Sequence, residues 1–113
     1  MRHCLMLDLK DDATLIAEYE AQHRAIWPEV AAHLRLHGVL DMDIYRLGTR
    51  LCMLMETDDA VFDAARMAEA AETDSCLQAW EQLMWRYQEP TPWTPASTKW
   101  CAAQCIFKLR LRL

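Results

Sequence analysis

The stretch that decides the fold is Val39-Leu-Asp-Met-Asp-Ile-Tyr-Arg-Leu47, Gly48-Thr49, Arg50-Leu-Cys-Met-Leu-Met-Glu-Thr57. Two apolar runs flank a glycine-containing dipeptide, which is typical of a β-hairpin. Side chains alternate between the two faces of a strand, so the first run divides into an apolar set and a polar set: Leu40, Met42 and Ile44 against Asp41, Asp43 and Tyr45. The polar face either lines a pocket or meets solvent.

Strand patterns also occur at both ends of the chain. Residues 2–10 alternate, with His3, Leu5, Leu7 and Leu9 on one side, and predict a first strand. Residues 88–100 contain three prolines and predict an irregular loop, because proline cannot donate a ladder hydrogen bond. The run Gln104–Leu109 predicts a last strand.

Helical spacing fills the segments between these strands. Asp11 or Asp12 is expected to cap a helix with the apolar stripe Leu15, Ile16, Tyr19, His23 and Ile26. Pro28 is expected to begin a second helix, which carries Val30, Leu34 and Leu36 and ends at Gly38. Asp58-Asp59 is expected to open a third, with Val61, Phe62 and Ala65, and Thr73-Asp74 to cap a fourth, with Leu77, Trp80, Leu83, Met84 and Tyr87.

The resulting order, β-α-β-β-α-β, predicts an α+β ferredoxin-like sandwich. We expect one domain over residues 1–113, with a four-stranded antiparallel sheet and helices on one face. An apolar opposite face must also be covered, and pairing two such sheets gives a homodimer of the dimeric α+β barrel type. Each subunit would then hold a cavity between its sheet and its helices.

Composition limits the function classes. The chain has 113 residues, 53% of them hydrophobic, and a net charge of −5, which excludes a disordered protein and disfavours nucleic acid and membrane partners. Asp8 interrupts the first apolar run too early for a signal peptide, and no stretch is long enough to span a membrane. Five cysteines without CxxC spacing predict reduced thiols rather than disulfides or a metal site. We therefore expect a cytoplasmic protein with a small-molecule ligand.

Tyr19 and His23 are the strongest candidates for chemistry. At helical spacing they lie one turn apart on the same face. An imidazole can take and give protons near neutral pH, so this pair predicts an acid–base site. The alternative is that His23 is a hydrogen-bonded packing residue.

The chain resembles the L-rhamnose mutarotase family over nearly its whole length. The matching motifs are Tyr19-x3-His23-x2-Ile26-Trp27-Pro28-Glu29, His37-Gly38, Asp43-Ile44-Tyr45, Thr73-Asp74-x-Cys76-x3-Trp80 and Ile106-Phe107-x-Leu109. The family consists of small ferredoxin-like dimers that interconvert the anomers of a 6-deoxy-hexose. The resemblance therefore implies an isomerase acting on a monosaccharide without a cofactor.

The resemblance also implies roles for individual residues. The histidine that matches His23 is the family's proton donor, and residues matching Tyr19 and Trp80 contact the sugar. We expect Trp27, Tyr45 and Asp43 to be further substrate-binding residues. The general base stays open, with Tyr19, Asp43, Glu29 and a water molecule as candidates, and a single histidine can also serve in both directions.

Two departures from the family pattern bear on the substrate. Met42 stands where the rhamnose-specific pattern has a sugar-binding tyrosine, and Ala79 stands where it has the first of two adjacent tryptophans. Losing a phenol and an indole removes a hydrogen-bonding group and a stacking surface, so L-fucose is a candidate substrate beside L-rhamnose. Trp85, Trp93 or Trp100 can resupply a stacking surface, and residues 110–113 extend beyond the usual end of the family.

Two rival interpretations use the same fold. Small monooxygenases and haem-degrading dimers share the sandwich, and a non-catalytic sugar-binding module would bind without turnover. Pocket polarity separates the first rival from a mutarotase, because haem needs a wide apolar slot whereas a sugar needs polar groups. The mutarotase interpretation ranks first, chiefly on the family resemblance.

Overall fold

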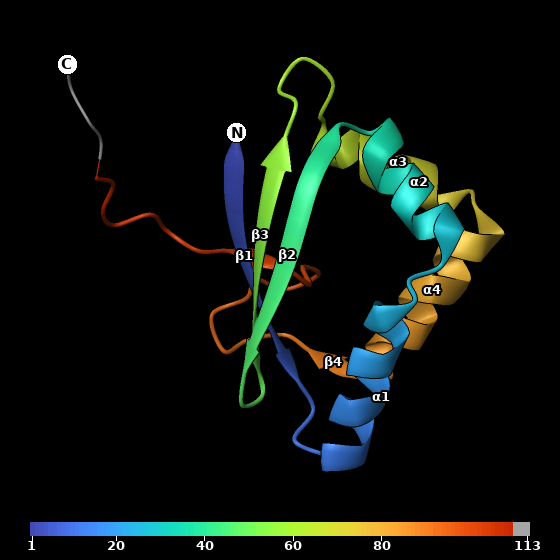
Figure 1. The fold of residues 1–113 in the computed structure, drawn as a ribbon, viewed down its shortest axis with the longest axis vertical. Helices are drawn as coiled ribbons and strands as arrows, with labels where there is room; N and C mark the ends of the chain where they lie inside the picture. Colours follow the sequence, from blue (N-terminus) through green and yellow to red (C-terminus); the bar gives the residue numbers. More distant parts are fainter. Residues whose placement is uncertain (110–113) are drawn as a thin grey trace.

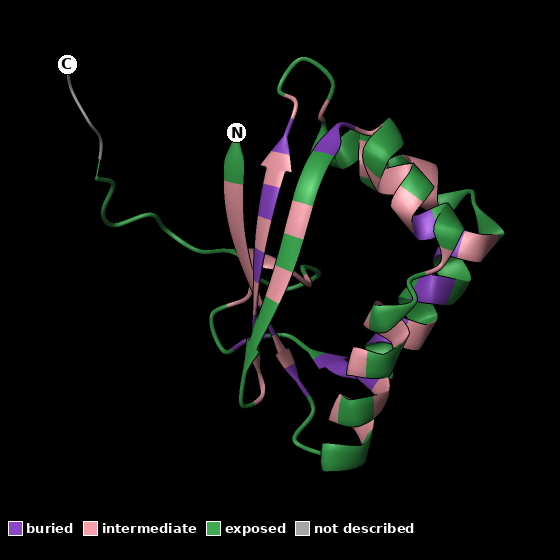
Figure 2. Ribbon diagram, in the orientation of Figure 1, coloured by how far each residue is buried: buried purple, intermediate pink, exposed green. Residues whose placement is uncertain are grey.

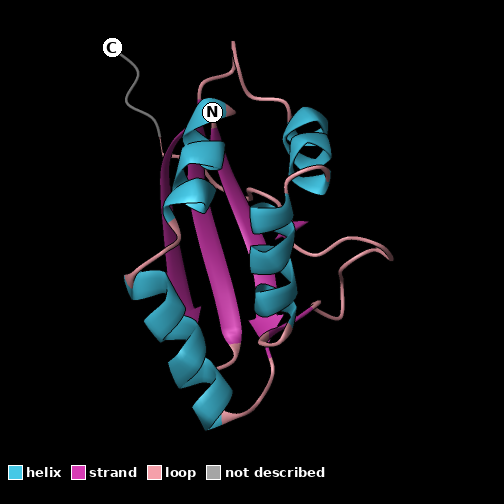
Figure 3. Ribbon diagram, turned by 90° about the vertical axis from the view of Figure 1, so that its right-hand side faces the viewer, coloured by secondary structure: helices cyan, strands magenta, loops and turns pink. Residues whose placement is uncertain are grey.

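The computed structural model describes residues 1–109, and its helices lie on one face of an antiparallel sheet (Figures 1 and 3). The elements are β1 (Arg2–Leu9), α1 (Ala13–Arg24), α2 (Pro28–Leu36), β2 (Val39–Leu47), β3 (Arg50–Thr57), α3 (Ala64–Glu72), α4 (Ser75–Trp85), β4 (Gln88–Glu89) and β5 (Cys101–Ala102). The strands run in the order β2-β3-β1-β4, and β5 pairs with β1 beside β4. The predicted α+β ferredoxin-like sandwich is confirmed.

The β2–β3 hairpin has the predicted strand limits and turn. Gly48 adopts a φ of +59°, a left-handed conformation that glycine tolerates best, and this closes the tight turn. The register pairs Met42 with Met55, Ile44 with Met53 and Arg46 with Leu51. Because these β3 partners are buried, Met42, Ile44 and Arg46 face the helices.

The core lies between the sheet and the helices. Figure 2 shows buried residues alternating along β3, as the period of a strand requires. The larger buried cluster joins the sheet to α1, α2 and α4 and contains Leu9, Tyr19, Val30, Leu51, Leu77, Trp80, Met84 and Tyr87. Tyr19 and Trp80 are therefore held in packed surroundings.

The helix caps largely follow the sequence prediction. Asp12 caps α1 by accepting a hydrogen bond from the Leu15 backbone N–H at 3.0 Å. Asp74 caps α4 in the same way, and Pro28 is the first residue of α2. In the predicted stripes of the first two helices, Ile26 is 39% exposed because α1 ends at Arg24, and Leu36 is 75% exposed because it is the last residue of α2.

The prediction that Asp58-Asp59 opens the third helix was wrong. The Asp58 carbonyl instead accepts hydrogen bonds from the N–H groups of Val61 and Phe62, and the Asp58 N–H donates to the Gly38 carbonyl. This turn packs closely on Gly38, where an added Cβ would lie 3.0 Å from the Phe62 nitrogen. A tertiary contact thus delays the helix until Asp63, which caps α3.

The C-terminal prediction was also wrong. The last strand is Cys101–Ala102, which pairs with Leu5 and Met6, while β4 occupies the positions opposite Asp8 and Leu9. β4 itself lies inside the segment predicted to be irregular. Residues 104–109 leave the sheet on the side away from the helices (Figure 1) and expose their large apolar side chains: Ile106, Phe107 and Leu109. The extension at 110–113 lies outside the described residues.

None of the helices within residues 1–109 is long and apolar enough to cross a membrane.

Candidate active site

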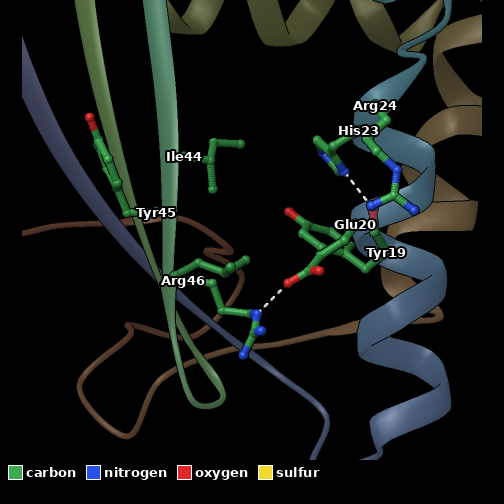
Figure 4. A pocket seen from close by; sticks show the side chains of 8 residues that line it. Tyr19, Glu20, His23, Arg24, Ile44, Tyr45 and Arg46 are labelled. Atoms are coloured by element: carbon green, nitrogen blue, oxygen red, sulfur yellow. Dashed lines mark hydrogen bonds and ion pairs between the residues drawn. The ribbon is translucent and has the colours of Figure 1, made fainter.

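A cavity of about 440 Å³ lies between α1 and the β2–β3 hairpin (Figure 4). Helix α1 contributes four lining residues, and the hairpin contributes the rest: Tyr19, Glu20, His23 and Arg24, and Ile44, Tyr45, Arg46 and Leu51. This volume falls in the range of small-molecule sites. The lining combines an apolar floor with titratable and charged groups, which suits a ligand rich in hydroxyl groups.

Tyr19 and His23 meet at this cavity, as their helical spacing predicts. Their ring centroids are 4.3 Å apart. The His23 Nδ1 lies 2.9 Å from the Tyr19 backbone carbonyl oxygen. A carbonyl can only accept, so Nδ1 carries a proton and donates it. In the neutral ring, Nε2 is therefore the nitrogen with a free lone pair.

Burial sets the protonation states of the two side chains. Burial lowers the pKa of His23, and the hydrogen bond to the Tyr19 carbonyl opposes this only in part. The imidazole is thus neutral at pH 7. Burial raises the pKa of Tyr19, against a smaller opposing effect of a hydrogen bond from Gln88, so the phenol keeps its proton. One side chain can accept a proton and the other can donate one.

Trp80 and Trp27 lie behind His23. The Trp80 ring meets the His23 ring edge-on at a centroid distance of 5.6 Å, and Trp27 meets Trp80 at 5.1 Å. Trp80 is only 8% exposed. The two indoles form a packed wall that fixes the imidazole, and the cavity lining itself consists of other residues.

Other predicted site residues are not brought together with His23. Tyr45 borders the cavity through its place on β2, but its side chain projects from the opposite side of the strand to Ile44 (Figure 4). Asp43 shares that outer face by strand alternation and is exposed. Glu29 is exposed at the start of α2 and contacts Cys76. Of the three candidate side chains for the base, only Tyr19 lines the cavity.

Met42 and the proposed replacement tryptophans also have defined places. Met42 faces the helices and packs against the smaller buried cluster around Met53. Trp100 packs against both core clusters, whereas Trp85 and Trp93 are 41% and 72% exposed. The part of the chain that the structure describes contains no group of three or more His, Cys, Asp or Glu arranged to hold a metal ion.

Comparison with known proteins identifies the family, because a family model described as L-rhamnose mutarotase matches residues 2–109. The chain belongs to this family. It is 46% identical over 110 residues to an L-fucose mutarotase from Xanthomonas campestris pv. campestris, covering 96% of this chain and 87% of the relative. It is 37% identical over 67 residues to an L-rhamnose mutarotase from Opitutus terrae, covering 59% and 62% of the two chains.

Solved structures agree on the fold of this L-rhamnose mutarotase family member. A crystal structure of an L-rhamnose mutarotase from Formosa agariphila superposes with a TM-score of 0.70 at 15% identity, covering 97% of this chain and 99% of the other. Tetracenomycin F2 cyclase from Streptomyces glaucescens superposes with a TM-score of 0.60 at 18% identity, covering 99% of each chain. At these identities the likeness concerns the fold alone.

Sequence reasoning missed Gln88 in this family member. Gln88 is 3% exposed, and its Nε2 donates to the Tyr19 hydroxyl at 3.2 Å. Its Oε1 has no hydrogen-bond partner among the described residues. The residue lies in the segment that was predicted to be a loop, and no motif marked it. Because Gln88 donates to the phenol oxygen, the hydrogen of the Tyr19 hydroxyl is free to donate to another acceptor.

Glu20 and Arg46 were also missed. Their side chains form an ion pair between α1 and β2 at the cavity (Figure 4). The signals in the sequence were weak: Glu20 precedes His23 by three residues, and Arg46 continues the inward-facing row of Met42 and Ile44. Only the fold shows that the two residues meet.

Proposed function

We propose that this protein is a mutarotase that interconverts the α and β anomers of a 6-deoxy-L-hexose, with L-fucose as the preferred substrate. The observation that carries the reaction is the neutral imidazole of His23, fixed through Nδ1 beside the Tyr19 phenol in a cavity lined by both charged and apolar side chains. The preference for L-fucose rests on the relatives. Identity is 46% over almost the whole chain to the L-fucose mutarotase, and 37% over 59% of the chain to the L-rhamnose mutarotase from Opitutus terrae.

Mutarotation needs two proton transfers and no redox step. A base takes the proton from the anomeric hydroxyl while an acid protonates the ring oxygen, and the bond between C1 and the ring oxygen breaks. The product is an open-chain aldehyde. Rotation about the C1–C2 bond and closure on the other face of the carbonyl give the second anomer, and both protons return.

His23 is the group we assign to the anomeric oxygen. The free lone pair on Nε2 accepts the hydroxyl proton, and the resulting imidazolium returns it on ring closure. The proton-donor role that the family resemblance implies then belongs to the closing step. General acid–base catalysis of this kind contributes roughly 10²–10⁴-fold.

Tyr19 is the group we assign to the ring oxygen. Gln88 donates to the phenol oxygen, so the phenol hydrogen is available to the sugar. Trp80 and Trp27 serve the site by packing behind the imidazole. Tyr45 and Asp43 lie on the outer sheet face, where they would meet a partner subunit rather than a sugar in this cavity.

The charged residues of the cavity lining favour a sugar over the substrates of the rival enzymes. Glu20, Arg24 and Arg46 would lie against any molecule in the cavity. Burying these charges against haem or an aromatic substrate would carry a desolvation cost without new hydrogen bonds. A ring of hydroxyl groups supplies those hydrogen bonds.

We further infer a homodimer formed through the outer sheet face. Cys4, Met6, Cys52 and Leu54 form an apolar strip on this face, which no described helix covers. Gel filtration with light scattering is expected to give twice the mass of one chain, and a monomer mass would refute the dimer. All five cysteines are free thiols, which supports a reducing compartment such as the cytoplasm.

The experiment that tests the function is proton NMR saturation transfer between the α and β anomeric signals at equilibrium. L-Fucose and L-rhamnose are measured separately, with and without the protein. Faster exchange of L-fucose than of L-rhamnose supports the proposal. Binding of either sugar without faster exchange would identify a binding module instead, and no effect from folded protein would reject both.

A further inference from the structure

The position of Arg46 calls for a functional explanation. The side chains before it on the helix-facing side of β2 are the apolar Met42 and Ile44, and its register partner Leu51 is 1% exposed. A charge at the edge of such a face loses part of its hydration, and a partner of opposite charge offsets that cost. The fold supplies such a partner from α1.

That partner is Glu20. The Arg46 Nε donates to the Glu20 Oε1 at 2.5 Å, and the Arg46 Nη1 donates to the Gly48 carbonyl at 2.8 Å. The pair joins the two walls of the cavity (Figure 4). Both side chains keep substantial contact with solvent, because Arg46 is 37% exposed and Glu20 is 43% exposed.

Each member of the pair also has hydrogen-bonding capacity to spare. The hydrogen bonds within residues 1–109 use neither the Glu20 Oε2 nor the Arg46 Nη2. A carboxylate oxygen accepts from a hydroxyl, and a guanidinium N–H donates to one. Two neighbouring hydroxyls of a sugar can satisfy both groups at once.

We propose that Glu20 and Arg46 bind the sugar hydroxyls remote from the anomeric carbon and determine which 6-deoxy-L-hexose is accepted. This inference rests on the mutarotase function proposed above. Glu20 precedes His23 by three residues, so both project from the same side of α1, about 5–6 Å apart at Cβ. That separation is close to the width of a pyranose ring. A sugar with its anomeric oxygen at His23 therefore reaches the ion pair with its other edge.

The chemistry of the candidate sugars supports this division of roles. L-Fucose and L-rhamnose present the same anomeric hydroxyl, ring oxygen and methyl group, but they differ in configuration at C2 and C4. His23 acts on atoms that the two sugars share. Discrimination must come from groups that contact C2 or C4, and a site built to hydrogen-bond a hydroxyl rejects the epimer that leaves its polar groups unpaired.

The test compares three sugars: L-fucose, L-rhamnose and 6-deoxy-L-glucose. The third differs from L-fucose only at C4 and from L-rhamnose only at C2, so it separates the two positions. Anomer exchange is measured by NMR at several sugar concentrations for the wild type, Glu20→Gln, Arg46→Gln and the double charge swap Glu20→Arg with Arg46→Glu. We expect each single variant to lose roughly 10- to 100-fold in kcat/KM for the preferred sugar. The ratio between L-fucose and 6-deoxy-L-glucose is expected to change most, because these two sugars differ at C4, whereas C2 adjoins the anomeric carbon.

The charge swap separates recognition from a merely structural bridge. A bridge needs only opposite charges, so the swap would restore the wild-type rates and sugar ratios. Recognition needs the acceptor on α1 and the donor on β2, so the swapped pair stays impaired. Glu20→Gln changes a half-exposed helix residue without changing its shape, and it keeps the test available if Arg46 variants fold poorly.

A matched control exists on the same helix. Glu18 pairs with Arg86 at 3.4 Å, with the side chains 41% and 59% exposed, and both residues lie outside the cavity lining. Glu18→Gln is expected to leave exchange of all three sugars unchanged. Restoration by the swap, or unchanged sugar ratios in the single variants of an active enzyme, would overturn the recognition role and leave the mutarotase function standing. A wild type that exchanges none of the sugars would overturn both.

Discussion

The His23 imidazole donates through Nδ1 to the backbone carbonyl of Tyr19, 2.9 Å away and one turn earlier in the same helix. This bond fixes which nitrogen of the neutral ring is free, and it places that ring 4.3 Å from the Tyr19 ring. The orientation comes from the backbone rather than from a separate carboxylate. Any variant that keeps α1 folded but removes the imidazole therefore tests the chemistry directly.

We predict that His23→Asn reduces anomer exchange by at least 10²-fold while the fold is kept. The Asn side-chain amide can still donate to a backbone carbonyl, but it cannot take a proton near pH 7. NMR exchange rates give the activity, and far-UV circular dichroism with urea unfolding gives the fold and its stability. A His23→Asn protein that exchanges the sugar at the wild-type rate would refute the assignment of His23.

The lowered pKa of His23 predicts how activity depends on pH. The neutral imidazole is the active form, so the rate should stay constant above the ordinary histidine pKa and fall as the pH drops through the lower pKa of the folded protein. His23→Asn should lack this acid limb in whatever residual exchange it shows. A wild-type rate that rises on acidification would mean that the imidazolium starts the reaction.

The same shift predicts a stability effect with a definite sign. In the window between the lowered folded pKa and the ordinary value of 6.5, the unfolded chain binds more protons at this site than the folded chain. The part of the wild-type free energy of unfolding that depends on neutral His23 is therefore fully present above pH 6.5, and it is lost as the pH falls through the pKa of His23 in the folded protein. Urea unfolding at pH 7.5 and pH 5 should show a larger loss for the wild type than for His23→Asn, and equal losses would contradict the shift.

The sequence predicted the features that depend on local spacing. Hairpin limits, the Asp12 and Asp74 caps and the shared face of Tyr19 and His23 follow from periods of two or 3.6 residues and from short-range capping. Features that depend on distant partners were missed. Glu20 meets Arg46 across 26 positions, and Gln88 meets Tyr19 across 69. The last strand was misplaced because β4 and β5 together occupy the free edge of β1, which the pattern of residues 104–109 does not reveal.

The Asp12 cap of α1 offers a matched comparison with the neighbouring Asp11. Asp12→Ala removes the acceptor of the Leu15 N–H at the start of α1 and is expected to cost about 1 kcal/mol of unfolding free energy. Asp11→Ala changes an exposed aspartate just before the cap and should stay within about 0.5 kcal/mol of the wild type. Urea unfolding of both variants at pH 7.5 decides the matter, and equal costs would show that the cap does not stabilise α1.

The hydrogen bond between Gln88 and Tyr19 should couple the two residues in catalysis more than in stability. Gln88→Leu removes the donor to the Tyr19 hydroxyl, but it also removes an Oε1 that has no partner within the described residues, so the net change in unfolding free energy should be within about 1 kcal/mol. Exchange should nevertheless slow, because the phenol is then free to rotate its hydrogen away from the sugar.

Tyr19→Phe should slow exchange further, and adding Gln88→Leu to it should have little additional effect, since the amide acts through the hydroxyl that is already gone. Rates for the two single variants and the double variant complete the cycle. Fully additive losses would show that Gln88 acts on the site by some route other than Tyr19.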